Sequence, residues 1–264
     1  MISSDFPDFP DFPDRNMKSI RAAIRYVLFV AATLGVYSVW WIGAIFVGRK
    51  PSWRQTIFRN WARSFVKISR MKIEVVGTPP QPPFFLVFNH LGYVDIAAIR
   101  AVTEGIFVAK GEIENWFLAG KIIRDMGTIF INRTNRRDIP RAGAKIIEHI
   151  KNGEGVIIFP EGTSTRGEKV LPFNSSFLEF AAAVNLPVSF ASVSYKTSGI
   201  DENASDAVCW WDDISFGAHL WKLFRLKEFT ATITFGNAPI QNPNRKQLAT
   251  ELREKVGEIF IPVI

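Results

Sequence analysis

Cysteine and histidine are scarce in this sequence of 264 residues. Cys209 is the single cysteine, which excludes an intrachain disulfide and a metal cluster built from cysteines. It lies in an aromatic run with no histidine beside it, so a buried structural cysteine is favoured over a nucleophile. The histidines, His90, His149 and His219, stand far apart and show no metal-ligand spacing. We therefore expect no metal and no other cofactor.

Charged residues are absent from one long stretch near the N-terminus. From Tyr26 to Gly48 no charge occurs, and a helix of this length would span about 35 Å, enough to cross a hydrocarbon core of about 30 Å. We predict a hydrophobic membrane helix at residues 22–48. A hairpin or a buried core helix is the alternative, because Gly35 and Gly43 interrupt the run.

Acidic residues are absent from the next stretch, residues 49–72, which carries eight Lys and Arg. Aromatic and aliphatic residues interleave with them at helical spacing, which predicts a basic amphipathic helix lying in an anionic headgroup layer. A core-facing helix with a solvated basic side, or a nucleic-acid patch, would show the same pattern. The position behind the apolar stretch favours the membrane, on its cytoplasmic face, which means the inner or plasma membrane.

Residues 1–21 contain Asp-Phe-Pro three times in succession. Proline blocks both helices and sheet ladders, so we expect a disordered tail there. The net charge of the chain is +7 and its pI is about 9.6. Such a balance favours anionic partners, either a membrane surface, phosphates or nucleic acid.

Strand and helix patterns alternate over residues 73–264, the predicted catalytic domain. This alternation predicts an α/β fold, an αβ sandwich with a central mixed sheet flanked by helices. Functional loops are expected at the carboxyl ends of the strands. The candidate strands cover 71–76, 84–88, 106–109, 128–132, 155–159, 188–195 and 229–235, and the candidate helices cover 93–103, 112–125, 138–151, 174–184 and 244–259.

Polar residues follow three of these strands. His90 opens the turn after the apolar run 84–88, and Asp95 stands five residues later. An imidazole can take a proton from a hydroxyl at neutral pH, and a carboxylate on its other nitrogen fixes the tautomer. The pairing needs a turn, which Gly92 makes plausible. The alternative is that His90 ends a strand and Asp95 caps the next helix.

The other two strands end in Asn132-Arg133 and in Pro160-Glu161-Gly162-Thr163. If the three strands are neighbours, a base, a cation and a carboxylate meet in one cleft. Each feature alone has an ordinary explanation, because Arg133 would suit a surface ion pair and Pro-Glu-Gly-Thr a helix-entry turn.

Rival functions each leave something unexplained. A non-catalytic membrane lipid-binding protein needs no proton acceptor, so His90 and Asp95 would have no role. A serine hydrolase lacks its Gly-x-Ser-x-Gly turn here. A nucleic-acid binder accounts for the basic charge but not for the apolar residues 26–48, so we expect no nucleic-acid partner.

Four short motifs resemble the ordered motifs of the glycerolipid acyltransferases, typified by 1-acylglycerol-3-phosphate acyltransferase. They are Asn-His-x-x-x-x-Asp at 89–95, Phe-Ile-Asn-Arg at 130–133, Phe-Pro-Glu-Gly-Thr at 159–163 and Leu-Pro-Val at 186–188. The resemblance implies that His90 is the general base and that Asp95 orients it. The acceptor hydroxyl then attacks the thioester of acyl-CoA or acyl carrier protein directly. The implied acceptor site contains Lys110, Arg133, Glu161, Gly162 and Thr163.

One departure concerns the acceptor. Members that form phosphatidic acid usually carry Arg directly after Glu-Gly-Thr, whereas this chain has Ser164, and its next cation is Arg166. We expect a lysophospholipid acceptor at a membrane, foremost 1-acylglycerol-3-phosphate, which would give phosphatidic acid in phospholipid biosynthesis. Because Arg is suited to bidentate phosphate contact, lyso-ornithine lipid stays open as an alternative acceptor.

Overall fold

A seven-stranded sheet forms the centre of the computed structural model, which describes residues 12–132, 138–199 and 201–263. Its strand order is β1-β7-β6-β2-β5-β3-β4. β6 and β7 pair antiparallel, and the other neighbouring pairs are parallel, so the predicted mixed sheet is confirmed. The strands are β1 (Met71–Val76), β2 (Phe84–Phe88), β3 (Ile106–Lys110), β4 (Ile129–Ile131), β5 (Gly155–Ile158), β6 (Val188–Thr197) and β7 (Phe229–Phe235).

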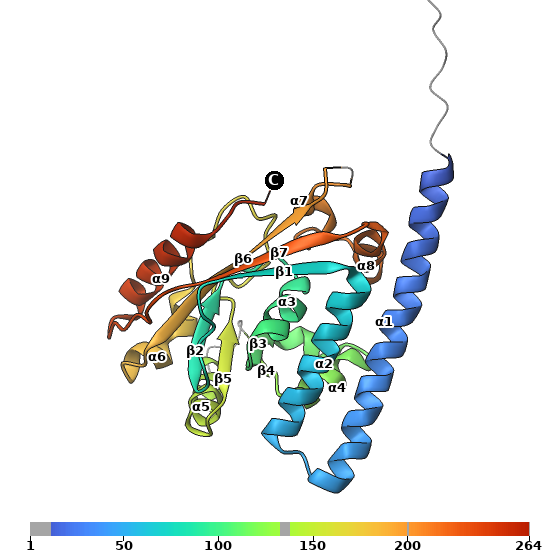
Figure 1. Cartoon of the computed structure of the whole chain (residues 1–264). Coiled ribbons are helices and arrows are strands. Elements are labelled where there is room, and N and C mark those ends of the chain that lie inside the picture. The colour runs from blue at the N-terminus through green and yellow to red at the C-terminus, as the bar shows by residue number, and fades with distance from the viewer. Residues whose placement is uncertain (1–11, 133–137, 200, 264) are drawn as a thin grey trace, which may run out of the picture.

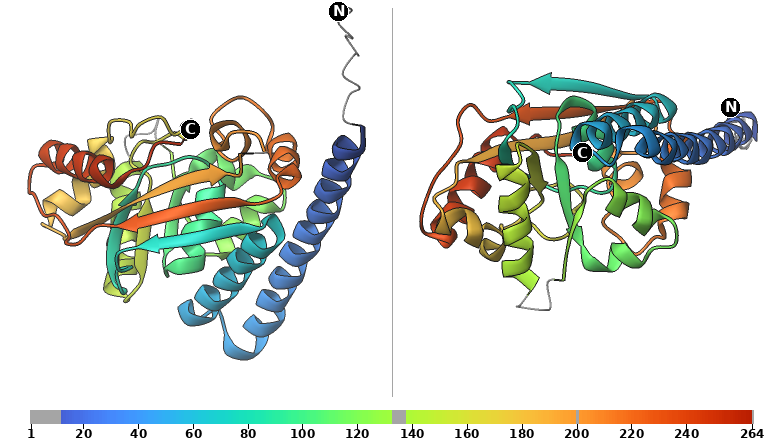
Figure 2. Two further views of the ribbon diagram at one scale, coloured as in Figure 1. Left: turned by 45° about the horizontal axis from the view of Figure 1, so that its top comes forward. Right: turned by 90° about the horizontal axis from the view of Figure 1, so that it is seen from below.

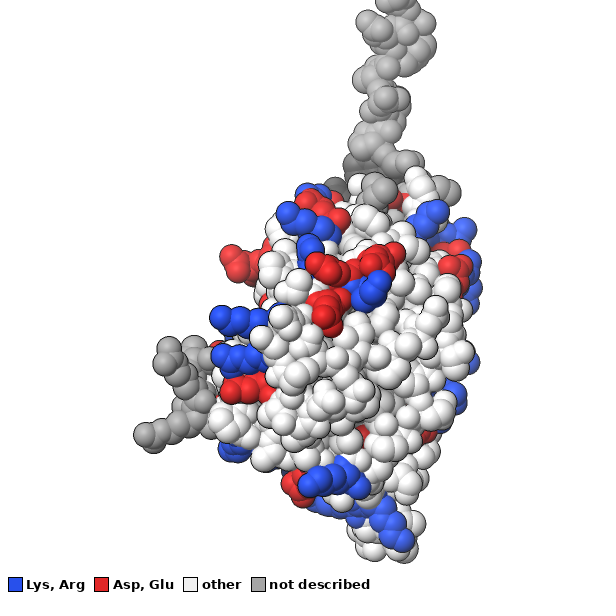
Figure 3. Space-filling model, turned by 90° about the vertical axis from the view of Figure 1, so that its left-hand side faces the viewer, with Lys and Arg blue, Asp and Glu red and all other residues white. Residues whose placement is uncertain are grey.

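Helices cover both faces of the sheet (Figure 2). Every residue of β2 is buried, and its side chains alternate between two apolar clusters. Leu86 lies in the cluster with α1 (Phe12–Val47), α2 (Pro51–Ser69), α3 (Val94–Val102) and α8 (Phe216–Arg225). Val87 lies in the opposite cluster with α5 (Asp138–Lys151), α6 (Glu179–Ala183) and α9 (Arg245–Ile259). At the end of the molecule that carries α6 and α9, charges of both signs lie mixed above a broad area of residues other than Lys, Arg, Asp and Glu (Figure 3).

The first helix, α1, begins at Phe12 and not at residue 22, so residues 12–21 are helical and the expected disorder is wrong for them. No proline occurs between Pro13 and Pro51, and nothing in this stretch therefore stops a helix. Residues 1–11 of the expected tail lie outside the described residues. One part of α1, Asn16–Val47, is long and apolar enough to cross a membrane.

α1 runs along the flank of the catalytic domain (Figure 1). Near its start, Arg25 donates a hydrogen bond of 2.6 Å to the carbonyl oxygen of Leu226. Further along, the hydroxyl of Tyr37 donates to a carboxylate oxygen of Asp125 at 2.7 Å. The other side of α1 exposes large apolar side chains, including Met17, Ile20, Ile24, Val27, Leu28, Leu34, Ile42, Ile45 and Phe46. The helix therefore has one face on the protein and one without protein cover.

The second helix, α2, differs from its predicted role as an interfacial helix over 49–72. Its apolar stripe packs into the protein, where Ile57, Phe58 and Phe65 are buried. Among its cations, Arg54 forms an ion pair with the buried Glu154 next to β5. A basic helix with an aromatic stripe has the same sequence pattern whether lipid or protein covers the stripe. Here the protein covers it, so the core-facing alternative describes α2.

Two other predicted helices are each divided. The expected helix 112–125 consists of a 3₁₀ helix, η1 (Gly111–Asn115), and α4 (Ala119–Asp125), and Leu118 between them has φ of +54°. The expected helix 174–184 consists of η2 (Ser175–Leu178) followed by α6. A short α7 (Ala204–Ala207) precedes α8.

The buried pair between Arg54 and Glu154 generates a stability prediction. The side chains of Arg54 and Glu154 are 14% and 7% exposed. Burial alone would raise the pKa of Glu154, but hydrogen bonds from His149 and Arg54 outweigh this effect and lower the pKa to about 2. Arg54→Ala should lower the free energy of unfolding by about 3 kcal/mol, because it leaves a buried carboxylate without its cation. Denaturant unfolding at neutral pH measures this loss. Lys255→Ala, which removes an exposed pair with Glu258, is the matched control and should leave the midpoint nearly unchanged. Equal midpoints for both variants would contradict the assignment.

Candidate active site

His90 and Asp95 are brought together by the turn between β2 and α3. Nδ1 of His90 lies 2.8 Å from Oδ2 of Asp95. The Asp95 side chain is fully buried in the first turn of α3, whereas that of His90 is 23% exposed. Gly92 in the turn has φ of +153°, and a Cβ there would lie 3.0 Å from the main-chain nitrogen of Trp210. The predicted pairing is therefore present, and it is reached through a turn that glycine permits.

The carboxylate of Asp95 is held by three further donors. Oδ2 accepts hydrogen bonds from the main-chain N–H groups of Leu91 at 2.7 Å and Gly92 at 3.1 Å. Oδ1 accepts one from the hydroxyl of Tyr195 in β6 at 2.7 Å. Burial and the adjacent Asp95 raise the pKa of Tyr195 well above its usual value, so this hydroxyl stays a donor. With a carboxylate on Nδ1, the tautomer is fixed, and Nε2 is the nitrogen that can accept a proton.

The main chain on both sides of His90 is fixed as well. The preceding Asn89 forms two side-chain hydrogen bonds with the main chain of Val193, at 2.8 and 2.9 Å. The carbonyl oxygen of His90 accepts from the N–H of Thr165 at 3.0 Å. The imidazole stacks on the ring of Phe159, with 4.1 Å between the ring centroids. Few rotamers remain open to the imidazole in this setting.

Glu161 follows β5, which pairs directly with β2. Its Oε1 accepts from the N–H of His90 at 2.9 Å, and its Oε2 accepts from the N–H of Leu171 at 3.0 Å. Burial raises the pKa of Glu161 to about 7, against the opposite effect of these two hydrogen bonds. In this structure Glu161 therefore ties the loop after β5 to the backbone of His90. Its expected contact with the acceptor stays a prediction.

The remaining predicted site residues stand at or after the ends of β3, β4 and β5 in the sequence. Gly162 has φ of +78° in the same turn, and Thr163 is exposed. Lys110 ends β3, the next strand of the sheet after β5, with its side chain 56% exposed and Nζ 3.6 Å from Glu112. Arg133 follows β4 in the sequence and lies outside the described residues.

Arg166 is engaged by a carboxylate. Its Nη2 lies 3.1 Å from Oδ1 of Asp206, and its guanidinium lies 5.5 Å from the ring centroid of Trp211. Ser164, which directly follows Glu-Gly-Thr, donates a hydrogen bond to the carbonyl oxygen of Trp210. Ser164 therefore ties the loop after β5 to the segment before α8.

Sequence reasoning missed Tyr195, Phe159 and Trp210 as parts of the site. One signal for Tyr195 was present in the sequence, because the hydroxyl of a tyrosine buried in a strand needs a hydrogen-bond partner. The sequence did not indicate that this partner is Asp95, since the two residues are 100 residues apart in the chain.

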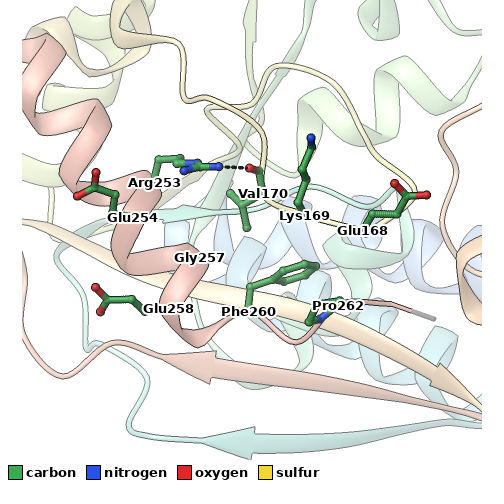
Figure 4. A pocket seen from close by; sticks show the side chains of 9 residues that line it. All are labelled: Glu168, Lys169, Val170, Arg253, Glu254, Gly257, Glu258, Phe260 and Pro262. Atoms are coloured by element: carbon green, nitrogen blue, oxygen red, sulfur yellow. Dashed lines mark hydrogen bonds between the residues drawn. The ribbon is translucent and has the colours of Figure 1, made fainter.

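Two other features of the structure are separate from this group. A surface hollow lies between α9 and the segment Glu168–Val170, where Arg253 donates to the carbonyl oxygen of Val170 at 3.1 Å (Figure 4). Its lining does not include His90, Asp95 or Glu161. Within the described part of the chain, no group of three or more His, Cys, Asp or Glu is placed to hold a metal ion.

Comparisons with known proteins agree with this geometry. The model of a family described as Acyltransferase matches residues 72–196. A 1-acyl-sn-glycerol-3-phosphate acyltransferase of Neisseria meningitidis is 31% identical over 71% of this chain and 73% of its own length. A lyso-ornithine lipid O-acyltransferase of Pseudomonas aeruginosa is 28% identical over 77% of this chain and 78% of its own.

A solved structure has the same fold. It is the 1-acyl-sn-glycerophosphate (LPA) acyltransferase PlsC from Thermotoga maritima, with a TM-score of 0.60 and 20% identity over 90% of this chain and 97% of that one. An αβ sandwich with a paired histidine and aspartate at the end of a central strand defines the class of protein. The chain belongs to the acyltransferase family, and both the resemblance in its motifs and the predicted α/β fold are confirmed.

The hydrogen bond from Tyr195 to Asp95 generates a kinetic prediction. Tyr195→Phe should lower kcat by about 10- to 100-fold, because one hydrogen bond to a charged group is worth about 1.5–3 kcal/mol. KM should change little, since Tyr195 positions Asp95 and is itself fully buried in the protein. Ser192→Ala is the matched control, because it removes another side-chain hydrogen bond of β6, 2.9 Å long, to the carbonyl oxygen of Ile259. If both variants lose activity equally, Tyr195 has only a structural role.

The raised pKa of Glu161 generates a prediction about stability and pH. Between its ordinary pKa and about 7, the unfolded chain loses this proton while the folded chain keeps it. The folded state then binds more protons, so the stability contributed by this group falls as pH rises through that window. Glu161→Gln should remove this slope. The measurement is the difference between wild-type and variant unfolding free energies from pH 5 to pH 8. A difference that stays constant would show that the carboxyl titrates normally.

Proposed function

We propose that this protein transfers an acyl chain from acyl-CoA or acyl carrier protein to the free hydroxyl of a lysophospholipid, foremost 1-acylglycerol-3-phosphate. The observation that carries the proposal is the buried Asp95 carboxylate, 2.8 Å from Nδ1 of a histidine that is itself partly exposed. That arrangement is suited to taking a proton from a hydroxyl at the protein surface. The family and its relatives support a lyso-lipid acceptor.

The proposed reaction is a direct displacement. Nε2 of His90 takes the proton of the acceptor hydroxyl while its oxygen attacks the thioester carbonyl carbon. The C–S bond then breaks, and the imidazolium returns the proton to the leaving thiolate. Asp95 stabilises the imidazolium between these two events. The products are the diacyl lipid and the free thiol of CoA or of the carrier protein.

An acyl-enzyme has no support from the described residues. The single cysteine, Cys209, is buried and only 2% exposed, and burial raises its pKa far above the ordinary value. Ser164 donates its hydroxyl proton to the carbonyl oxygen of Trp210. Neither side chain is poised as a nucleophile beside His90.

Membrane attachment is part of the proposal. α1 carries a continuous apolar surface that no protein covers, and it is fixed to the catalytic domain by Arg25 and Tyr37. We place this surface in the acyl-chain layer of the cytoplasmic leaflet. There the acceptor diffuses laterally into reach of His90.

A second acceptor, lyso-ornithine lipid, is favoured by a specific observation. The position that usually carries the phosphate-contacting Arg is Ser164, which is used in a main-chain hydrogen bond, and the next cation, Arg166, is paired with Asp206. These surroundings of residues 164 and 166 suit an acceptor whose headgroup has no phosphomonoester. Lysophosphatidate remains supported by Lys110 at the end of β3 and by Arg133 in the second motif.

Replacing the base tests the proposed chemistry. His90→Ala should lower kcat by about 10² to 10⁴, the size of general-base assistance. The measurement is acyl transfer by the purified chain in mixed micelles, with circular dichroism as the check on folding. Near-normal transfer by a folded variant would remove His90 from the mechanism.

The acceptor is tested by arginine variants with two substrates. Arg133→Ala should raise KM for lysophosphatidate by about 10- to 100-fold, equivalent to 1.5–3 kcal/mol for a charge-assisted contact. Arg166→Ala should have a smaller effect, because Asp206 already engages the guanidinium. KM for the acyl donor should change little in both. Arg245→Ala, which removes a cation from the exposed pair with Glu179, is the control. Transfer to lyso-ornithine lipid but not to lysophosphatidate by the wild type would decide for the second acceptor.

A further inference from the structure

The turn between η1 and α4 presents three consecutive large apolar side chains to the outside. The exposed fractions are 39% for Trp116, 97% for Phe117 and 45% for Leu118. We name these three residues the aromatic turn. Contiguous apolar surface of this kind is unfavourable in water and marks a contact with an apolar partner.

The aromatic turn is fixed by its own backbone. The N–H of Ala119 donates to the carbonyl oxygen of Phe117 at 2.5 Å, and that of Gly120 donates to Trp116 at 2.8 Å. Leu118 has φ of +54° and ψ of −47°, a conformation that a branched side chain rarely adopts. Gly120 packs so closely on the carbonyl of Glu114 that no Cβ would fit. The outward direction of Phe117 is therefore built into the fold.

The aromatic turn adjoins the apolar face of α1. It leads directly into α4, whose last residue, Asp125, accepts the hydrogen bond from Tyr37 of α1. Nζ of Lys121 in α4 lies 4.9 Å from the ring centroid of Trp41 in α1. Beyond Trp41, α1 continues with Ile45 and Phe46, which are 79% and 81% exposed. Through α4, two exposed apolar segments from different parts of the chain are thus connected.

Cations flank both segments. The guanidinium of Arg49 lies 4.8 Å from the ring centroid of Trp41, and Lys121 stands one turn after the aromatic turn. Arg124 is 53% exposed in the same helix. Exposed apolar side chains next to a tryptophan and basic residues match the layers of a bilayer, where acyl chains lie below anionic headgroups. Three residues are also too small a surface for a stable protein interface, which buries about 800 Å² on each partner.

Aromatic rings connect the aromatic turn to the active site. The ring of Trp116 lies 6.4 Å from that of Trp210 and 6.0 Å from that of Phe216. The N–H of Trp210 in turn donates to the carbonyl oxygen of Leu91, the residue after His90, at 2.8 Å. One aromatic layer therefore separates the turn from the loop that carries the base.

We propose that the aromatic turn is a second membrane-inserted element, whose occupant is the acyl-chain layer of a lipid bilayer. Phe117 and Leu118 insert among the acyl chains, and Trp116 lies at the headgroup level. Together with α1, the turn gives the catalytic domain two separate points of attachment, so that the His90 side faces the lipid surface. The proposal rests on the membrane attachment proposed above, and the experiment separates the two.

The test uses single labelled cysteines in the full chain. A nitrobenzoxadiazole probe is attached at Phe117→Cys, at Phe46→Cys on α1 and at Val184→Cys, an exposed position after α6. Cys209 is replaced by serine in all three. Each protein is reconstituted into vesicles of equal parts phosphatidylcholine and phosphatidylglycerol. Quenching by lipids with a nitroxide on the acyl chain is then compared with quenching by aqueous iodide.

We expect the probes at residues 117 and 46 to be quenched by the acyl-chain nitroxide and shielded from iodide, and the probe at 184 to behave in the opposite way. If the probe at 46 is quenched by lipid but that at 117 only by iodide, the aromatic turn stays in water and the proposal is overturned. If neither is quenched by lipid, the membrane attachment through α1 fails as well.

A charge substitution provides a second, independent readout. Phe117→Asp should lower acyl transfer to an acceptor presented in vesicles by about tenfold or more, because a carboxylate is costly to insert among acyl chains. Transfer to the same acceptor in detergent micelles should stay near the wild-type value, and Val184→Asp should affect neither. An equal loss in vesicles and micelles would show that residue 117 supports the fold and not the membrane contact.

Discussion

The carboxylate of Asp95 is the group on which the active site depends. It receives donors from the turn after β2 and from Tyr195 in β6, and its remaining contact is the imidazole of His90. A buried carboxylate is stable only when such donors surround it. Because the donors come from the turn after β2 and from the neighbouring strand β6, the imidazole of His90 is correctly oriented only when the centre of the sheet is assembled.

The loop after β5 completes this arrangement from the other side. Glu161 and Thr165 bind the N–H and the carbonyl of the same residue, His90, so its backbone is fixed independently of its side chain. The parallel pairing of β2 with β5 puts both loops at one edge of the sheet. Ser164 extends the contact to Trp210 and, through it, to the aromatic residues before α8. The site is thus a set of loops joined mainly through main-chain groups.

How far the sequence predicts this structure depends on the range of the interactions. β2 and α5 have the predicted bounds because their apolar patterns are local, and the pairing of His90 with Asp95 needed only a turn. The contact of Tyr195 with Asp95 had no local signal. The sequence predicts that lipid covers the apolar stripe of α2, because such a stripe does not reveal what covers it. The break in the helix at Leu118 arises from a backbone angle that leucine rarely adopts. The side chain of Arg133 lies outside the described residues.

The way α1 is fastened has a consequence for the topology of lipid synthesis. Arg25 binds the end of α8, and Tyr37 binds the end of α4, so the helix is joined to the catalytic domain at two distant points. Such a helix cannot stand upright across a bilayer without taking the domain with it. In the membrane attachment proposed above, an enzyme held in this way would work on one leaflet only, and every lipid it completes would enter that leaflet. Growth of the opposite leaflet would then require a separate transport step that moves the finished lipid across the bilayer.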